Sequence, residues 1–365
     1  MRTRTIAQLM RTTLLLGVVT CSVPSAQAME VYGAWHCGSD MCDWGTVRTL
    51  SEFDQKNHWL IDRGDGTGKP SVNVVVLSFV NPLDLLNKAT PTDPLAGIPA
   101  GMTEDVVKYF TNKNVRVMLS IGGITFVKDW NTALAKNARQ LGLNAAAVAQ
   151  RLKVGIEIDY EENRSPNLTG LQAFIDAYRS VIGYDATGTI PEARLTIDLA
   201  AGDRWLIDIT RKATADWLTI ANPVLDYANA MVPARQPRAA DAIANWQEHV
   251  DGKPQYGPPI PPLAPAKFTG SLWLVGSKPI PECTNFAKSL QYPTSTGNFV
   301  RTVLAKSDSG GTTAGMLGYM FWAAECEGSR TVCTTPLDKS TCEGGMGAAA
   351  AYYGIPIPMP ALRQQ

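Results

Sequence analysis

The sequence predicts a single-domain (β/α)8 barrel that occupies residues 29–365, and three observations support this fold. Mainly apolar, β-branched runs recur along the chain, as is typical of strands covered on both faces. Helix-like stretches lie between these runs, an alternation that indicates a parallel sheet. The runs also number eight, which suits a barrel of this length. The predicted strands are Val31–Trp35, Val72–Val80, Val115–Ile121, Val154–Tyr160, Arg194–Leu199, Leu225–Val232, Ser271–Val275 and Gly318–Trp322.

The segments between the strands fit this order. Arg139–Leu152 and Leu168–Ile182 have the composition or apolar spacing of helices. Lys253–Pro265 is rich in proline and is expected to be a long ordered loop between the sixth and seventh strands, although an inter-domain linker is the alternative. The run Pro356–Pro360 is expected to be a surface tail. A doubly wound open sheet is the alternative fold, which the lack of G-x-G-x-x-G after the first strand disfavours.

The composition excludes several functional classes. The chain has 365 residues with 33 basic and 33 acidic side chains, so its formal net charge is zero. An 18% charged and 45% hydrophobic composition indicates an ordered globular protein. Without a basic excess, nucleic acid is not an expected partner. The three histidines, His36, His58 and His249, are not spaced as a metal pair, so we expect neither a metal nor a cofactor.

Residues 1–28 are predicted to be a secretory signal peptide. Three arginines precede an apolar stretch, Thr12–Val23, and Ala26-Gln27-Ala28 forms a small-residue cleavage site. A membrane anchor is the alternative, but the stretch is shorter than the roughly 20 apolar residues that a membrane span needs. We therefore expect a secreted protein, extracellular or periplasmic, that is a monomer without membrane contact.

Cysteine usage agrees with export. Of the seven cysteines, Cys21 lies in the predicted leader, and an even number remains. Paired cysteines in an exported protein predict disulfides, and six cysteines allow 15 pairings, among which Cys37–Cys42 is favoured by proximity in the sequence. Free buried thiols are the alternative; a zinc site is disfavoured because no C-x-x-C pair occurs. The remaining cysteines are Cys37, Cys42, Cys283, Cys326, Cys333 and Cys342.

The fourth predicted strand carries the strongest functional signal. Glu157, Asp159 and Glu161 alternate with apolar residues, so on a strand their side chains share one face. In a parallel strand that is covered on both sides, three carboxylates are costly unless they have a function. Burial and mutual repulsion are expected to raise at least one carboxyl pKa, and such a group can donate a proton near neutral pH. The alternative is an amphipathic strand with one solvated face.

This strand resembles the D-G-x-D-x-D-x-E signature of glycoside hydrolase family 18, the chitinases and endo-β-N-acetylglucosaminidases. Three further segments are similar to motifs of this family in the same order, so the resemblance extends along residues 29–365. The matching segments are Ser120-Ile121-Gly122-Gly123 (S-x-G-G), Leu225–Met231 (the sixth strand) and Met320-Phe321-Trp322 (the floor tryptophan).

The resemblance implies retaining, substrate-assisted catalysis on chitin or other N-acetylglucosamine-containing glycans. Glu161 would be the general acid and Asp159 would hold the acetamido group of the substrate, with Glu157 behind Asp159. Trp322 would form the floor under the sugar. Further sugar-binding candidates are Trp35, Gly122, Gly123 and Met231, and Trp130 and Trp205 are weaker ones.

The sequence departs from the family pattern at three positions. Val154 stands in place of the first Asp of the signature, and Glu157 in place of the second. Pro233 stands where a tyrosine commonly holds the acetamido oxygen, so Tyr227 or Asn229 is the expected substitute. Two alternatives to a chitinase-like enzyme remain on this barrel: an endo-β-N-acetylglucosaminidase acting on N-glycans, and a non-catalytic chitin-binding protein. A two-lobed solute-binding protein is a third alternative, on another fold.

Overall fold

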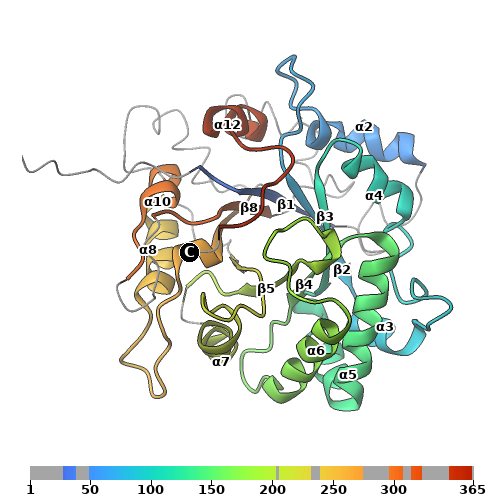
Figure 1. The fold of residues 1–365 in the computed structure, drawn as a ribbon, viewed down its shortest axis with the longest axis vertical. Helices are drawn as coiled ribbons and strands as arrows, with labels where there is room; N and C mark the ends of the chain where they lie inside the picture. Colours follow the sequence, from blue (N-terminus) through green and yellow to red (C-terminus); the bar gives the residue numbers. More distant parts are fainter. Residues whose placement is uncertain are drawn as a thin grey trace, which may run out of the picture.

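The computed structural model describes residues 28–37, 49–202, 205–231, 239–273, 296–306, 314–322 and 345–363. Eight parallel strands close into a barrel in which each strand pairs with its neighbours in sequence and β8 pairs with β1. This architecture confirms the predicted (β/α)8 fold, and Figure 1 shows helices around the strands. The strands are β1 Val31–Cys37, β2 Val74–Val80, β3 Arg116–Gly122, β4 Gly155–Asp159, β5 Leu195–Leu199, β6 Ala228–Ala230, β7 Phe268–Trp273 and β8 Gly318–Trp322.

The helices follow the strands in the order that the alternating pattern predicts. In Figure 1, α3, α5 and α6 lie side by side along the barrel. The α-helices are α2 Leu50–Ile61, α3 Pro82–Lys88, α4 Glu104–Thr111, α5 Val127–Leu152, α6 Leu168–Val181, α7 Ile207–Lys212, α8 Ala239–Asp251, α10 Thr296–Thr302 and α12 Gly345–Tyr353. The short turns are η1 Ile124–Phe126, η2 Pro191–Ala193, η3 Ala213–Trp217 (a π-helical turn) and η5 Pro265–Lys267. No helix among these residues is long and apolar enough to cross a bilayer.

Helix α5 begins twelve residues before the predicted start at Arg139. It is interrupted at Asn137, whose backbone is extended (φ −166°), and the side chain of Asn137 accepts a hydrogen bond from the amide of Gln140 at 3.0 Å. Asn137 therefore caps the second half of the helix, which is the part that the sequence pattern predicts. Helix α6 agrees with its predicted range to one residue, and Asn167 caps its first turn.

The sequence predicts a loop and a surface tail outside the strands, and the structure fully confirms only the loop. Lys253–Pro265 runs from the end of α8 to η5, between β6 and β7, as an ordered loop. The predicted surface tail at Pro356–Pro360 is correct only in part: Pro358 is exposed, but Met359 and, just after the segment, Leu362 are 6% and 7% exposed. Both pack with apolar residues inside the barrel, so the C-terminal segment closes the barrel at the N-terminal ends of its strands.

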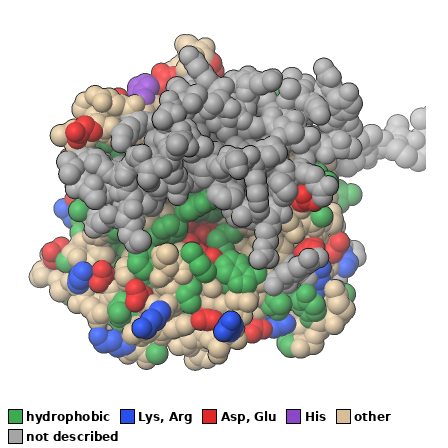
Figure 2. All heavy atoms as spheres, turned by 180° about the vertical axis from the view of Figure 1, so that it is seen from behind, with side chains coloured by type: hydrophobic (Ala, Val, Ile, Leu, Met, Phe, Trp, Pro, Cys, Tyr) green, Lys and Arg blue, Asp and Glu red, His purple; other side chains and the backbone are tan. Residues whose placement is uncertain are grey.

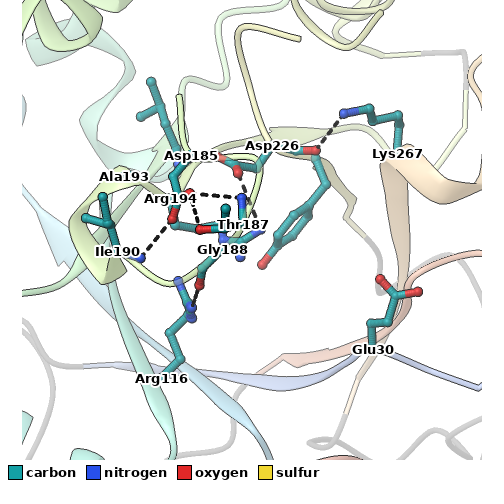
Figure 3. Close-up of polar contacts among 12 residues, drawn as sticks. Glu30, Arg116, Asp185, Thr187, Gly188, Ile190, Ala193, Arg194, Asp226 and Lys267 are labelled. Atoms are coloured by element: carbon teal, nitrogen blue, oxygen red, sulfur yellow. Dashed lines mark hydrogen bonds and ion pairs between the residues drawn. The ribbon is translucent and has the colours of Figure 1, made fainter. Parts of the chain in front are cut away.

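A buried ionic network lies at the same end of the barrel (Figure 3). Asp226, 4% exposed, pairs with Arg194 at 3.4 Å and with Arg179 at 3.2 Å, and accepts a hydrogen bond from the amide of Leu195 at 2.8 Å. Lys267 donates to the carbonyl oxygen of Asp226. Asp226 thus links the segments before β5, β6 and β7, through its carboxylate to Arg194 and Leu195 and through its carbonyl oxygen to Lys267.

Replacing Asp226 by Asn should destabilise the fold by about 3–5 kcal/mol, because it leaves the buried guanidinium of Arg194 without its counter-charge. The free energy of unfolding in urea measures this effect. Asp208→Asn is the matched control: Asp208 pairs with Arg211 at 2.5 Å but is half exposed, and such a pair contributes only about 0.2–1 kcal/mol. Equal, small losses in the two variants would contradict a structural role for the network.

The predicted signal peptide lies outside the described residues, apart from Ala28. The same holds for the predicted disulfides, since no cysteine side chain among the six candidates is described.

Candidate active site at the mouth of the barrel

The carboxylates of the fourth strand lie on one side of β4, and the apolar residues lie on the other. Ile156, Ile158 and Tyr160 pack in the layer between barrel and helices. Glu157 and Asp159 face the interior, where they are 0% and 4% exposed. Glu161 follows the end of the strand and is half-buried. Burial therefore decreases along the strand, from Glu157 at depth to Glu161 at the mouth.

A cavity of about 410 Å³ opens at the C-terminal ends of the strands. Asp159, Glu161 and a further acid, Asp198, contribute the carboxyl groups of its wall. Figure 2 shows the side of the molecule opposite to Figure 1, where hydrophobic side chains surround a few acidic ones, as they do in this cavity. The remaining lining residues are Trp35, Phe79, Ile124, Thr125, Met231 and Trp322. A mostly apolar pocket with a few convergent polar groups is the usual form of a small-molecule site.

Three aromatic rings form a continuous wall of the cavity. The Trp322 ring stands edge-on to that of Trp35, with ring centroids 6.3 Å apart, and is tilted against Phe79 at 5.6 Å. Trp35 comes from β1, Phe79 from β2 and Trp322 from the end of β8, which are neighbours in the closed sheet. The closure of the barrel thus brings together aromatic residues from both ends of the sequence. Flat apolar rings of this kind can stack on the C–H face of a pyranose.

Glu157 lies below the cavity lining, where Trp35 and Asn229 donate hydrogen bonds to its two carboxylate oxygens. Trp35 Nε1 donates to its Oε1 at 2.8 Å, and Asn229 Nδ2 donates to its Oε2 at 2.6 Å. Asn229 in turn accepts a hydrogen bond from the hydroxyl of Thr269 at 2.7 Å. The Trp35 ring therefore lines the cavity, while its indole N–H is hydrogen-bonded to Glu157. Asn229 contacts Glu157 and is not among the cavity-lining residues.

Gly122 and Gly123 allow the chain after β3 to pass close to the backbone carbonyl oxygen of Asp159. Gly122 has φ +121°, and a Cβ at this residue would lie 1.9 Å from the carbonyl oxygen of Asp159 and 2.2 Å from Trp130 Nε1. Gly123 has φ +92°, and its amide donates to that same carbonyl oxygen at 2.9 Å. The chain then turns so that the amide of Ile124 donates to the carboxylate of Glu161. The two glycines thus position the acids and do not line the cavity.

The remaining candidates differ in their positions. Met231 lines the cavity just after β6. Tyr227 does not: it is fully buried, and its hydroxyl faces the sulfur of Met118 at 3.9 Å. Trp130 is also fully buried and donates to the carbonyl oxygens of Ile121 and Asp159, and Trp205 packs partly buried against the helix-side core. Val154 is buried in the core before β4 and carries no charge, and Pro233 lies outside the described residues.

Asp198, at the inward face of β5, is the main residue that the sequence-based prediction missed. Leu195, Ile197 and Leu199 pack on the helix side, so Thr196 and Asp198 point into the barrel. This alternation repeats that of β4 and was visible in the sequence, although β5 carries a single acid. No group of three or more His, Cys, Asp or Glu side chains in the described segments has the arrangement of a metal site.

Burial raises the pKa of all four carboxyl groups, and neighbouring charges add to this effect at Asp159 and Asp198. Burial raises the pKa of Glu157 to about 7 and that of Glu161 to about 7. Burial also raises the pKa of Asp159, as do the charges of Glu161 and Glu157, and it raises that of Asp198 along with the charges of Glu157 and Asp159. Carboxylates that share a low-dielectric site cannot all be ionised, so the cluster retains protons at neutral pH. Such a cluster can donate a proton to a bound substrate.

The raised pKa values predict a pH-dependent stability. The folded protein binds the Glu157 proton more tightly than the unfolded chain does, so the stabilisation is full below pH 4.5 and is lost as the pH rises through about 7. Glu157→Gln should therefore flatten the fall in unfolding free energy between pH 5 and pH 8. Urea unfolding across this range measures the slope, with Asp176→Asn on the exposed face of α6 as control. An unchanged slope in Glu157→Gln would contradict the assigned protonation.

The structure was also compared with known proteins. No family model matches the sequence, and no curated protein matches it. Similar solved structures are GH18 chitinases. A GH18 chitinase from Pseudoalteromonas aurantia is 13% identical over 88% of this chain and 99% of its own, with a TM-score of 0.49. A group IV chitinase from Ostrinia furnacalis in complex with allosamidin is 12% identical over 90% and 100%, with a TM-score of 0.48.

A third similar structure, a family GH18 chitinase from Cycas revoluta in complex with (GlcNAc)3, is 14% identical over 80% of this chain and 95% of its own, with a TM-score of 0.44. At these identities and TM-scores the likeness establishes no activity. The chemistry of this chain is carried by the side chains around its own cavity.

Proposed function

We propose that this chain is a glycosidase that hydrolyses β-1,4 linkages of N-acetylglucosamine polymers or oligosaccharides with retention of configuration. The observation that carries the proposal is the cavity in which Asp159 and Glu161 lie beside the aromatic wall of Trp35, Phe79 and Trp322. A sugar stacked on these rings would have both carboxyl groups within reach. The resemblance of the β4 segment to the acidic signature of glycoside hydrolase family 18 supports the same assignment.

Each step of the proposed reaction has a group in the cavity. Glu161 at the mouth donates its proton to the glycosidic oxygen as the bond from this oxygen to the anomeric carbon breaks. The carbonyl oxygen of the substrate's own acetamido group bonds to that carbon, which gives an oxazolinium ion. Asp159 accepts the acetamido N–H and stabilises the positive charge. Water then attacks the anomeric carbon, the bond from this carbon to the acetamido oxygen breaks, and the Glu161 carboxylate takes a proton from the water, so the configuration is retained.

The positions of the other acids agree with this division of roles. Glu157 is occupied by Trp35 and Asn229 and lies below the cavity, from where its charge acts on Asp159. The pKa of Glu161, raised to about 7 by burial, lets it carry a proton near neutral pH and lose it during the reaction. We also propose that the protein is secreted, on the basis of its first 28 residues and its cysteine usage, and that it acts as a monomer.

The test is to incubate the protein with chitin oligosaccharides and, separately, with a high-mannose glycoprotein, and to identify the products by mass spectrometry. We expect shortened N-acetylglucosamine oligomers with the first substrate. Release of an intact N-glycan would instead assign an endo-β-N-acetylglucosaminidase. Tight binding of oligomers without turnover would refute the enzymatic proposal and identify a glycan-binding protein.

A further inference from the structure

Asp198 lines the cavity but has no role in the reaction as described above. It comes from β5, next to β4 in the barrel, and is 2% exposed. Its backbone is paired with that of Asn229 on β6. Its Oδ1 is buried and accepts or donates no hydrogen bond within the described parts of the chain. A buried polar atom that lacks a partner is costly, and in a residue that lines a cavity a ligand can provide the partner.

The surroundings of Asp198 favour its neutral form. Its side chain is hydrogen-bonded with those of Glu157 and Asn229, and a bond between two carboxyl groups requires a proton on one of them. When Glu157 supplies that proton, the single proton of neutral Asp198 is left for a ligand. The charges of Glu157, Asp159 and Glu161 all oppose its ionisation. No cation among the described residues lines the cavity to offset them. Burial and these charges raise the pKa of Asp198 well above its usual range.

The proposed reaction needs a hydrogen-bond donor on this side of the cavity. Asp159 accepts the N–H of the acetamido group, and the carbonyl oxygen must still be turned toward the anomeric carbon. The indole N–H of Trp35 is committed to Glu157. Thr125 belongs to η1, the turn whose first amide contacts Glu161. Trp322 and Thr125 also carry donors in the cavity wall, on β8 and η1. Asp198 is the lining residue on β5, next to the strand of Asp159.

We propose that Asp198, as a neutral carboxylic acid, donates a hydrogen bond to the acetamido carbonyl oxygen and thereby selects N-acetylated sugars. This inference rests on the proposed glycosidase function and adds a specificity residue to it. No bond to the substrate is formed or broken at Asp198. A donor hydrogen bond orients the oxygen that attacks the anomeric carbon, and an ionised carboxylate at the same place would repel it.

The test compares two variants in a Glu161→Gln background, which removes both turnover and the titration of the general acid. The dissociation constant of tri-N-acetylchitotriose is measured between pH 5 and pH 9 from the change in tryptophan fluorescence. Asp198→Asn keeps a neutral donor of almost the same shape, and Asp198→Ala removes it. Thr125→Val removes the other hydroxyl donor of the cavity wall and serves as control. Thermal unfolding of each variant reports whether it is folded.

We expect Asp198→Ala to weaken binding about tenfold at pH 6, the effect of one hydrogen bond of about 1.4 kcal/mol. Asp198→Asn should bind within about threefold of its parent at pH 6. Its affinity should depend less on pH than that of the parent, which loses affinity as the pH rises and Asp198 ionises. If Asp198→Ala does not fold, the pH profile of the affinity of Asp198→Asn is sufficient to test the inference.

Two results would overturn the inference: equal losses in Asp198→Asn and Asp198→Ala, or a pH profile that Asp198→Asn leaves unchanged. A loss confined to Thr125→Val would assign the donor to Thr125 and also overturn it. Turnover of a chromogenic chitobioside by the unmodified chain is measured in parallel. If the unmodified chain neither hydrolyses the chitobioside nor binds tri-N-acetylchitotriose, the proposed function fails, and this inference fails with it. If the unmodified chain hydrolyses the chitobioside but Asp198→Ala binds tri-N-acetylchitotriose normally, only the role of Asp198 is rejected.

Discussion

Replacing Glu161 by Gln should lower the turnover of a chromogenic chitobioside by about 10²–10⁴-fold, the range that general acid–base catalysis contributes. The amide keeps the shape of the side chain and cannot protonate the leaving oxygen. Because Glu161 must be protonated to act, the rate of the unmodified protein should also fall as the pH rises above about 7. Initial rates between pH 5 and pH 9 measure both effects.

The neighbouring acid supplies a matched control. Glu162 accepts hydrogen bonds from Asn131 at 2.8 Å and from the amide of Arg164 at 2.8 Å, and it does not line the cavity. Glu162→Gln should therefore leave the rate within a few-fold of the parent. A dinitrophenyl leaving group needs no proton, so it should restore much of the rate of Glu161→Gln and abolish the fall above pH 7. A few-fold loss with the ordinary substrate would contradict the assignment of Glu161.

Asp159→Asn should lower turnover by about 10²–10³-fold, as the loss of one preorganised electrostatic partner typically does. The amide can still contact the acetamido group but cannot stabilise the positive charge of the oxazolinium ion. We therefore expect the Michaelis constant to change little while kcat falls. Steady-state kinetics with the chitobioside separate these two parameters.

The leaving group distinguishes this variant from Glu161→Gln. The defect in Asp159→Asn concerns charge on the sugar, so a dinitrophenyl leaving group should not restore its rate. If the activated substrate rescued Asp159→Asn as fully as Glu161→Gln, Asp159 would act in proton transfer and the proposed division of roles would be wrong.

The local sequence pattern predicted the barrel well, because the apolar, β-branched composition of each strand is visible within a few consecutive residues. The apolar runs that begin at Val31, Val115 and Val154 all became strands, and the alternation in β4 predicted which side chains face the interior. The prediction was less accurate where pairing decides the ends. Among the described residues of the predicted strand Leu225–Val232, Ala228–Ala230 form β6, and β7 begins at Phe268, before the predicted Ser271.

The site could be predicted only in part, because most of its contacts join strands distant in sequence. Asp198 is a single acid on β5, and nothing in its own segment shows that barrel closure places it beside β4. Tyr227 has the right residue type and the right strand face. It lies two residues before Asn229, however, and at about 3.3 Å per residue this places its ring well below the cavity. Burial of the C-terminal run at Met359 likewise depends on the open end of a barrel assembled elsewhere.

The central claim is that the substrate's acetamido group is the nucleophile in a cavity where Asp159 and Glu161 act on either side of it. The most direct test compares two chromogenic disaccharides that differ only at C2, a chitobioside with the acetamido group and a cellobioside with a hydroxyl. We predict hydrolysis of the chitobioside, with the β-anomer as the first product in proton NMR, and no detectable hydrolysis of the cellobioside. Comparable rates on both substrates, or the α-anomer as the first product, would contradict this account.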